Sequence, residues 1–128
     1  MHIDGASLRN LEVFSSLGDG SKRHSLWGVL NYTVTAMGAR TLYQWLSQPL
    51  VDIREILSRQ EAVFVLLEAA AARNELRTLL EQVQDIQRLL GRLVSGSGTP
   101  RDLLALSHSL QRMEPLKAQI DVLLGSQL

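Results

Sequence analysis

The chain has 128 residues, 45% of them hydrophobic, with no cysteine and with 13 basic against 13 acidic side chains. This length and composition suit one domain with one core, and the lack of cysteine excludes a disulfide framework and a thiolate metal site. Balanced charge excludes a basic stripe that grips phosphates, so we expect at most weak, non-specific DNA binding. No signal-peptide pattern or apolar run of the roughly 18 residues of a membrane span is present, so we expect a soluble intracellular chain.

The N-terminal residues fit two kinds of secondary structure. Leu8, Leu11 and Phe14 have a helical spacing, whereas residues 11–13 alternate as in a strand. We favour a short strand over residues 10–14.

A glycine- and serine-rich segment follows, with the sequence SSLGDGSKRHS over residues 15–25. Such a composition is typical of a mobile surface loop. The segment contains the basic run Lys22-Arg23-His24, with Asp19 close by. The acidic neighbour favours a solvated loop over a phosphate contact.

The rest of the chain predicts helices that begin at capping residues. Ser25, Thr35, Asp52, Asp85 and Thr99 each precede a segment rich in helix formers. In chain order, the predicted helices cover residues 26–31, 36–47, 53 to a bend near 70–73, 74–83, 85–94, 100 to about 113, and 116–124.

Helix ends are marked by proline and glycine. Pro49 ends the second predicted helix, the glycine- and serine-rich residues 95–98 form a loop, and Gly125 ends the last helix. Apolar residues recur at helical spacing and predict the core-facing positions. These are Met37, Leu42, Trp45, Leu46, Ile53, Ile56, Leu57, Val63, Phe64, Leu67, Leu76, Leu79, Leu80, Val83, Ile86, Leu89, Leu90 and Leu93. The sum is an all-α, multihelical fold with one short N-terminal strand.

Candidate reactive residues do not form a catalytic or metal-binding pattern. His2, His24 and His108 are far apart and lack a second ligand at metal-binding spacing. Residues 18–22, GDGSK, lack the spacer and the Gly-Lys-Ser/Thr ending of a phosphate-binding loop. We therefore predict no catalytic residue, no cofactor-binding residue and no metal ligand in this chain.

Charged residues of the helix over 85–94 support two interpretations. Asp85, Arg88 and Arg92 are spaced i,i+3 and i,i+4, so they can share one helix face. They form either a solvated ion pair of little energetic value or a partly buried Asp–Arg pair that holds two helices together. Arg40 or Arg59, from neighbouring helices, are alternative partners for Asp85.

Two tryptophans and one arginine lie among apolar residues. We interpret Trp27 and Trp45 as core or helix-contact residues rather than base-stacking platforms. Trp45 and Leu42 are expected to be buried at a helix corner, where Gly38 allows close backbone approach. Arg40 either lays its stem along apolar surface or donates to carbonyls at a helix end.

Several short motifs, in register over nearly the whole chain, resemble the core or lever domain of MutS-type DNA mismatch repair proteins. The most specific stretch is residues 25–50, SLWGVLNYTVTAMGARTLYQWLSQPL. The other motifs are Ile3-Asp4, Leu8-Arg9-Asn10-Leu11-Glu12-Val13, Ile56, Arg59-Gln60, Ala62-Val63, Leu76, Asp85-Ile86, Arg88-Leu89, Arg92-Leu93 and Pro100-Arg101-Asp102-Leu103.

The resemblance implies a fragment: a single helical domain over residues 1–128 that matches the first part of the core. The mismatch-reading, clamp and ATPase parts of such proteins are absent from this sequence. Residues that match the family motif are expected to have structural roles. They are Gly38, Arg40, Leu42, Trp45, Pro49, Arg59, Asp85, Arg88 and Arg92.

The resemblance further implies a non-catalytic segment that couples mismatch binding to ATP hydrolysis in a longer parent protein. No cofactor is expected in this fragment, whereas the parent would use ATP and Mg²⁺. The expected partners are the parent's other domains and, through them, mismatched DNA; the parent would be a homodimer of the bacterial cytoplasm or nucleoid, with no membrane contact. The alternative function is a self-contained helical protein–protein interaction module.

We predict that the isolated chain neither binds nor hydrolyses ATP, because no glycine-rich loop of it ends in Gly-Lys-Ser/Thr. Titration calorimetry with ATP and Mg²⁺ should give no saturable heat. A saturable isotherm with micromolar affinity would contradict the prediction.

Overall fold

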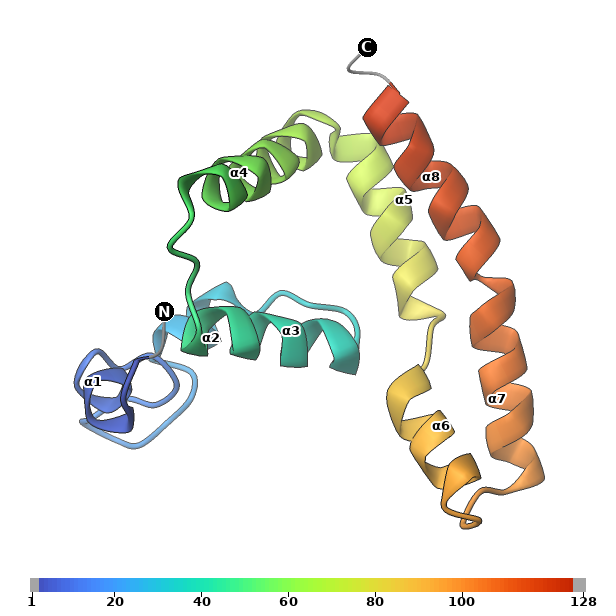
Figure 1. Cartoon of the computed structure of the whole chain (residues 1–128), viewed down its shortest axis with the longest axis horizontal. Coiled ribbons are helices and arrows are strands. Elements are labelled where there is room, and N and C mark those ends of the chain that lie inside the picture. Colours follow the sequence, from blue (N-terminus) through green and yellow to red (C-terminus); the bar gives the residue numbers. More distant parts are fainter. Residues whose placement is uncertain (1–2, 126–128) are drawn as a thin grey trace. The chain divides into compact units, whose positions relative to one another are not determined.

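The structure, a computed structural model, describes residues 3–125. In this range the chain forms eight α-helices and no strand, which confirms the predicted all-α, multihelical class (Figure 1). They are α1 (Gly5–Asn10), α2 (Leu26–Leu30), α3 (Ala36–Ser47), α4 (Ile53–Glu68), α5 (Ala70–Glu81), α6 (Ile86–Val94), α7 (Pro100–Gln111) and α8 (Met113–Gly125). None of these helices is long and apolar enough to cross a membrane.

The N-terminal residues form helix α1, and the strand predicted over residues 10–14 is wrong. The carboxylate of Asp4 accepts a hydrogen bond of 2.9 Å from the backbone N–H of Ser7, which caps the helix start. The Ser7 hydroxyl also donates to this carboxylate and holds the pKa of Asp4 below its ordinary value. Glu12, at φ 51°, turns the chain after the helix has ended. A local cap therefore outweighs the weak alternation of the sequence.

The chain divides into two compact units. The first comprises Met1–Thr33 and Gly38–Ser58, and the second comprises Val34–Met37 and Arg59–Leu128.

Ser25 organises the loop of the first unit. Its hydroxyl donates to the carbonyl of Lys22 at 2.6 Å and accepts from the backbone N–H of Gly28 at 3.2 Å, which caps α2 as predicted. The backbone N–H of Trp27 reaches back to the carbonyl of Val13 at 2.8 Å. Ser25 and Val13 are both buried. The loop is therefore held by the hydrogen bonds of a buried hydroxyl and by the burial of an apolar side chain.

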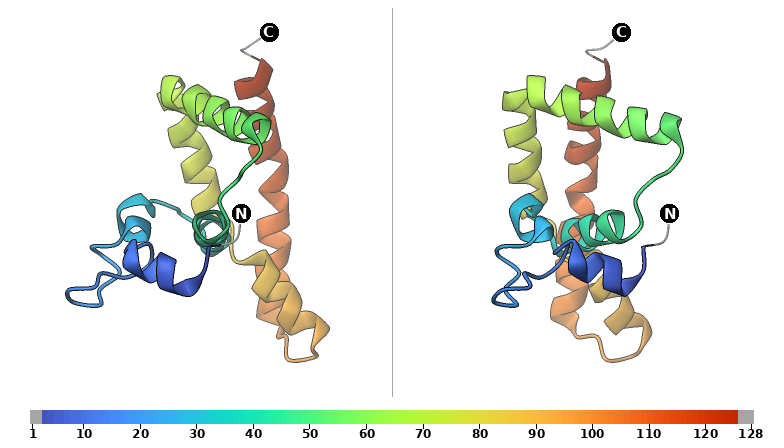
Figure 2. Two further views of the ribbon diagram at one scale, coloured as in Figure 1. Left: turned by 60° about the vertical axis from the view of Figure 1, so that its left-hand side comes forward. Right: turned by 90° about the vertical axis from the view of Figure 1, so that its left-hand side faces the viewer.

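The second unit is built from two antiparallel helix pairs, α5 with α8 and α6 with α7 (Figures 1 and 2). Its buried apolar side chains come from all four helices or the segments beside them: Val83, Leu89, Leu106, Leu116 and Leu123. The fully buried hydroxyl of Ser109 donates to the carbonyl of Ala105 at 2.8 Å and accepts from the backbone N–H of Gln84 at 3.0 Å. The linker between α5 and α6 is thus tied to α7.

The predicted inward face of α4 is wrong. Ile53, Leu57, Val63, Phe64 and Leu67 all lie exposed, and Ile56, Val65 and Leu66 are the half-buried apolar residues of this helix. The helix is apolar over much of its circumference, so periodicity alone does not identify the side that is covered.

Four smaller expectations also need correction. Trp45 is 45% exposed and Leu42 is half-buried, so neither fills the core position predicted for it. Leu90 of α6 likewise points outward. The predicted bend near residues 70–73 lies at Ala69, and α7 stops at Gln111 rather than near residue 113. A hydrophobic spacing shows which face is apolar, whereas burial depends on what packs against it.

We predict opposite effects for two Gly→Ala substitutions. A Cβ at Gly28 would lie 2.0 Å from the carbonyl oxygen of Lys22, whereas a Cβ at Gly91, inside α6, meets nothing within 4 Å. Gly28→Ala should cost about 1–3 kcal/mol through overpacking, and Gly91→Ala should gain about 0.5–1 kcal/mol through helix propensity. Urea unfolding of both variants measures these changes in the free energy of unfolding. If Gly28→Ala leaves this free energy unchanged, the loop around Lys22 moves to make room for the added Cβ.

Candidate functional site: a polar joint between two helices

The end of α6 is closed by backbone hydrogen bonds around a left-handed glycine. Gly96 has φ 73°, and its N–H donates to the carbonyl of Leu93 at 3.2 Å. The N–H of Ser97 donates to the carbonyl of Arg92 at 3.1 Å. This pair of bonds is a Schellman motif, which satisfies the last carbonyls of the helix and turns the chain sharply.

The start of α7 is closed by a reciprocal capping box, as the sequence predicts. The Thr99 hydroxyl accepts from the backbone N–H of Asp102 at 3.3 Å, and the Asp102 carboxylate accepts from the backbone N–H of Thr99 at 2.9 Å. Pro100 occupies the first helical position, where its missing N–H costs nothing.

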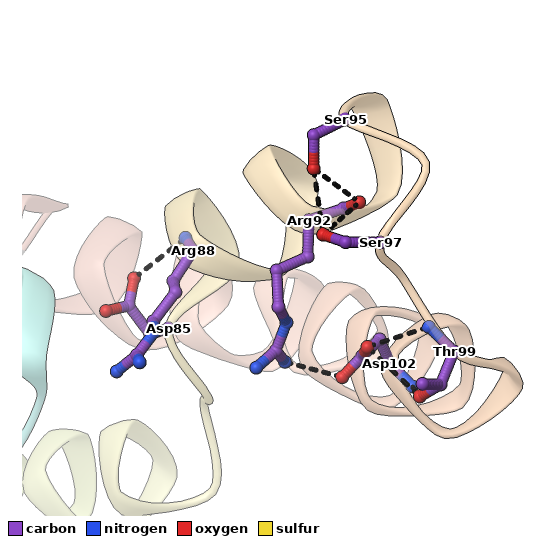
Figure 3. A network of polar contacts seen from close by, with 7 residues as sticks. All are labelled: Asp85, Arg88, Arg92, Ser95, Ser97, Thr99 and Asp102. Atoms are coloured by element: carbon purple, nitrogen blue, oxygen red, sulfur yellow. Dashed lines mark hydrogen bonds and ion pairs between the residues drawn. The ribbon is translucent and has the colours of Figure 1, made fainter.

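An ion pair joins the two helices across this turn. Nη2 of Arg92 on α6 lies 2.5 Å from Oδ1 of Asp102 on α7 (Figure 3). The Asp102 side chain is 15% exposed and that of Arg92 is 42% exposed, so the pair is partly shielded from water. A partly buried Asp–Arg pair does hold two helices together, as one of the two interpretations predicted. Its carboxylate is that of Asp102 and not that of Asp85.

The identity of this partner could be read from the sequence. Arg92 and Asp102 each lie five positions from Ser97, so an antiparallel turn centred on Ser97 places them opposite each other. Spacing within one helix, which links Arg92 to Arg88 and Asp85, does not reveal a partner across a loop.

Hydrogen bonding sets the protonation of Asp102. The backbone N–H of Thr99 is the main cause that holds the pKa of Asp102 below its ordinary value. Burial opposes this effect, and the Thr99 hydroxyl and the Arg92 guanidinium add to it. The carboxylate is therefore charged wherever the domain works near neutral pH, and it serves the cap and the ion pair at once.

Asp85 caps the other end of α6. Its side-chain Oδ1 accepts from the backbone N–H of Arg88 at 3.2 Å, which confirms the predicted helix start (Figure 3). A carboxylate at this position is favoured by the helix dipole. Arg88 itself is exposed. The pairing of the Asp85 carboxylate with an arginine side chain stays a prediction.

The remaining family-motif residues, apart from Pro49, lie on two other helices. Gly38, Arg40, Leu42 and Trp45 are all on α3, and Arg59 is on α4. Pro49 follows the end of α3 at Ser47, as predicted. Their structural roles in the family stay predictions.

In the loop over residues 15–25, the basic run contacts the acidic side chain of Asp19. Nδ1 of His24 lies 3.0 Å from Oδ2 of Asp19, with both side chains at least half exposed. The backbone N–H of Ser21, then its hydroxyl and His24, lower the pKa of Asp19 to about 2. Nζ of Lys22 lies 5.9 Å from the Trp27 ring. These internal contacts favour the predicted solvated loop. Over residues 3–125, no three His, Asp or Glu side chains gather as a metal site.

Taken together, these features define a helical domain whose polar side chains hold helix ends and helix pairs. The model of the family described as MutS domain III matches residues 6–126, and the chain belongs to this family.

Relatives in bacteria and archaea share this stretch. A DNA mismatch repair protein MutS of Symbiobacterium thermophilum is 46% identical over 121 residues, which cover 94% of this chain and 14% of the relative. Those of Pelotomaculum thermopropionicum and Methanothrix thermoacetophila are 43% and 42% identical, over 91% and 88% of this chain and 14% and 13% of the relatives. The chain thus spans about one-seventh of the length of these relatives, and the resemblance seen in its motifs is confirmed.

We predict that Asp102→Asn lowers the melting temperature at pH 7, because the neutral amide weakens the cap and the ion pair. The pKa of Asp102 in the folded chain lies below its ordinary value of 3.8, so its contribution is present above that value and is lost as pH falls through the folded pKa. The difference from wild type should therefore shrink below about pH 4.

Thermal melts between pH 7 and pH 2 measure this difference. Asp121→Asn, on the exposed surface of α8, is the matched control and should change little at any pH. An undiminished difference at pH 2 would show that Asp102 stabilises the joint by its shape and not by its charge.

Proposed function

We propose that this chain is the non-catalytic helical core, or lever, segment of a DNA mismatch repair protein. In the full-length parent it couples mismatch binding to the binding and hydrolysis of ATP. The observation that carries the proposal is the exposed apolar face of α4, formed by Ile53, Leu57, Val63, Phe64 and Leu67. A surface of this kind on a family member implies that the chain works packed against something else.

The rest of the parent polypeptide is the occupant that we propose for this face. The chain spans about one-seventh of its relatives' length, so most of a parent of that kind lies outside the structure. ATP with Mg²⁺, mismatched DNA and the second subunit would be bound by those other parts.

Stiff joints support the relay role. Coupling between distant sites is carried by packed side chains, hydrogen-bond networks and rigid secondary elements. The Arg92–Asp102 pair connects α6 with α7, and the buried Ser109 hydroxyl connects the linker before α6 with α7. A movement applied to one of these helices is therefore passed to the other instead of being absorbed in the loop.

We predict that Asp85→Asn in the full-length parent slows mismatch-stimulated nucleotide exchange, because a looser start of α6 transmits less of the movement. We expect a change of about two- to thirty-fold, the range that 0.5–2 kcal/mol of coupling represents. Stopped-flow release of a fluorescent nucleotide, with and without mismatched duplex, measures the rate, and DNA affinity and basal ATPase activity should stay at wild-type values.

Asp121→Asn serves as the control in the same assay. If Asp85→Asn clearly lowers the stability of the parent but leaves mismatch-stimulated nucleotide exchange at the wild-type rate, then Asp85 stabilises the fold and has no part in the coupling. The isolated chain gives a second reading by light scattering: concentration-dependent association supports an apolar face that the parent covers, whereas a strictly monodisperse chain supports the self-contained interaction module.

A further inference from the structure

The break between α4 and α5 lies where the sequence favours a continuous helix. α4 ends at Glu68 and α5 begins at Ala70, with Ala69 between them at φ −93° and ψ 59°. Residues 69–72 are all alanine, the residue with the highest helix propensity, and no side chain caps the start of α5. Local sequence therefore does not cause the break, and something else must hold it.

An arginine side chain holds the break. Nη1 of Arg73 donates to the carbonyl of Leu66 at 2.7 Å and lies 3.2 Å from the carbonyl of Leu67. In a continuous helix these two carbonyls would accept from the backbone N–H groups of Ala70 and Ala71. The guanidinium thus takes the place of two backbone donors.

The helical hydrogen bonds on either side of the break are already present. The N–H of Ala69 donates to the carbonyl of Val65 at 3.0 Å, and the N–H of Arg73 donates to the carbonyl of Ala69 at 2.9 Å. To form a continuous helix, the carbonyls of Leu66 and Leu67 exchange the Arg73 guanidinium for backbone donors, and the backbone rotates mainly at Ala69. The two arrangements differ by a local change.

The packing around the bend does not tie α4 to one surface. On its inner side an apolar groove of about 290 Å³ remains between α4, α5 and α8. It is lined by Ala62, Val65, Leu66, Leu76, Leu80, Leu116, Ile120 and Leu123. Side chains do not fill this groove, so α4 is not packed tightly against α5 and α8 here. The other face of α4 is also apolar and is exposed.

We propose that residues 69–73 form a two-state joint. The bent arrangement exchanges with one continuous helix over residues 53–81, and the hydrogen bonds of Arg73 stabilise the bent state. In the continuous state the carbonyls of Leu66 and Leu67 return to backbone donors, and α4 withdraws from the groove. The joint is a property of the chain itself and holds whether or not the domain relays movement.

Distances between two spin labels separate the two states. The chain has no cysteine, so Glu61→Cys on α4 and Glu81→Cys on α5, both exposed, provide a unique pair of labels. Twenty residues of continuous helix span about 30 Å between Cα atoms, and the bent form is shorter. Double electron–electron resonance should show the short distance in most wild-type molecules and the long one in about a tenth of them.

Two substitutions should shift these populations in opposite directions. Arg73→Met keeps an unbranched apolar stem but removes the guanidinium donors. It should raise the equilibrium constant for the long-distance state about tenfold, so that roughly half of the molecules show the long distance. Ala70→Pro should abolish the long distance, because proline lacks an N–H and clashes with the carbonyl of Leu66 in a continuous helix. Proline is well tolerated at the first position of α5 in the bent form.

Arg101→Met, an exposed arginine of α7, is the matched control and should leave the distances unchanged. A folded Arg73→Met chain with only the short distance would overturn the proposal, since the break would then be a fixed corner. If Arg73→Met does not fold, wild type and Ala70→Pro decide the matter: identical distance distributions overturn the proposal, and loss of the long distance in Ala70→Pro supports it.

Discussion

Backbone groups at helix ends need hydrogen-bond partners, and in this chain side chains supply them at nearly every turn. Asp4, Ser25, Asp85 and Thr99 each accept a backbone N–H at a helix start, and Arg73 donates to carbonyls at a helix end. Few apolar side chains are fully buried, so the caps have an unusually large part in fixing where the chain turns. The α6–α7 pair of the second unit depends directly on such a turn, because these two helices meet only if the loop between them has the right length and direction.

Caps are also the features that the sequence predicts best. Ser25, Asp85 and Thr99 mark helix starts by chemistry that acts within three residues, and each was found where its sequence motif placed it. Burial depends on distant parts of the chain, which explains the errors at Trp45 and on α4. The N-terminal strand failed for a related reason: a one-residue cap at Asp4 decides between two weak patterns.

The candidate site shows the same division. Membership of the MutS domain III family could be predicted because it rests on motifs spread along the whole chain. Spacing within one helix does not predict the Arg92–Asp102 pair, whereas the symmetry of the two residues about Ser97 does. The break at Ala69 carries no local signal, since alanine favours the helix on both sides of it. The Arg73 side chain, four positions further on, donates to a carbonyl at the end of α4, and no pattern of hydrophobicity records this contact.

The buried hydroxyl of Ser109 has a consequence for the order of folding. It accepts from the backbone of Gln84, which precedes it by 25 residues. The linker between α5 and α6 can therefore gain this hydrogen bond only after α7 has formed and docked. During synthesis, α5 and α6 leave the ribosome before that partner exists, so their relative orientation stays open until the later helix arrives. The α5–α8 and α6–α7 helix pairs are consequently expected to become ordered together, as one cooperative unit, rather than one after the other.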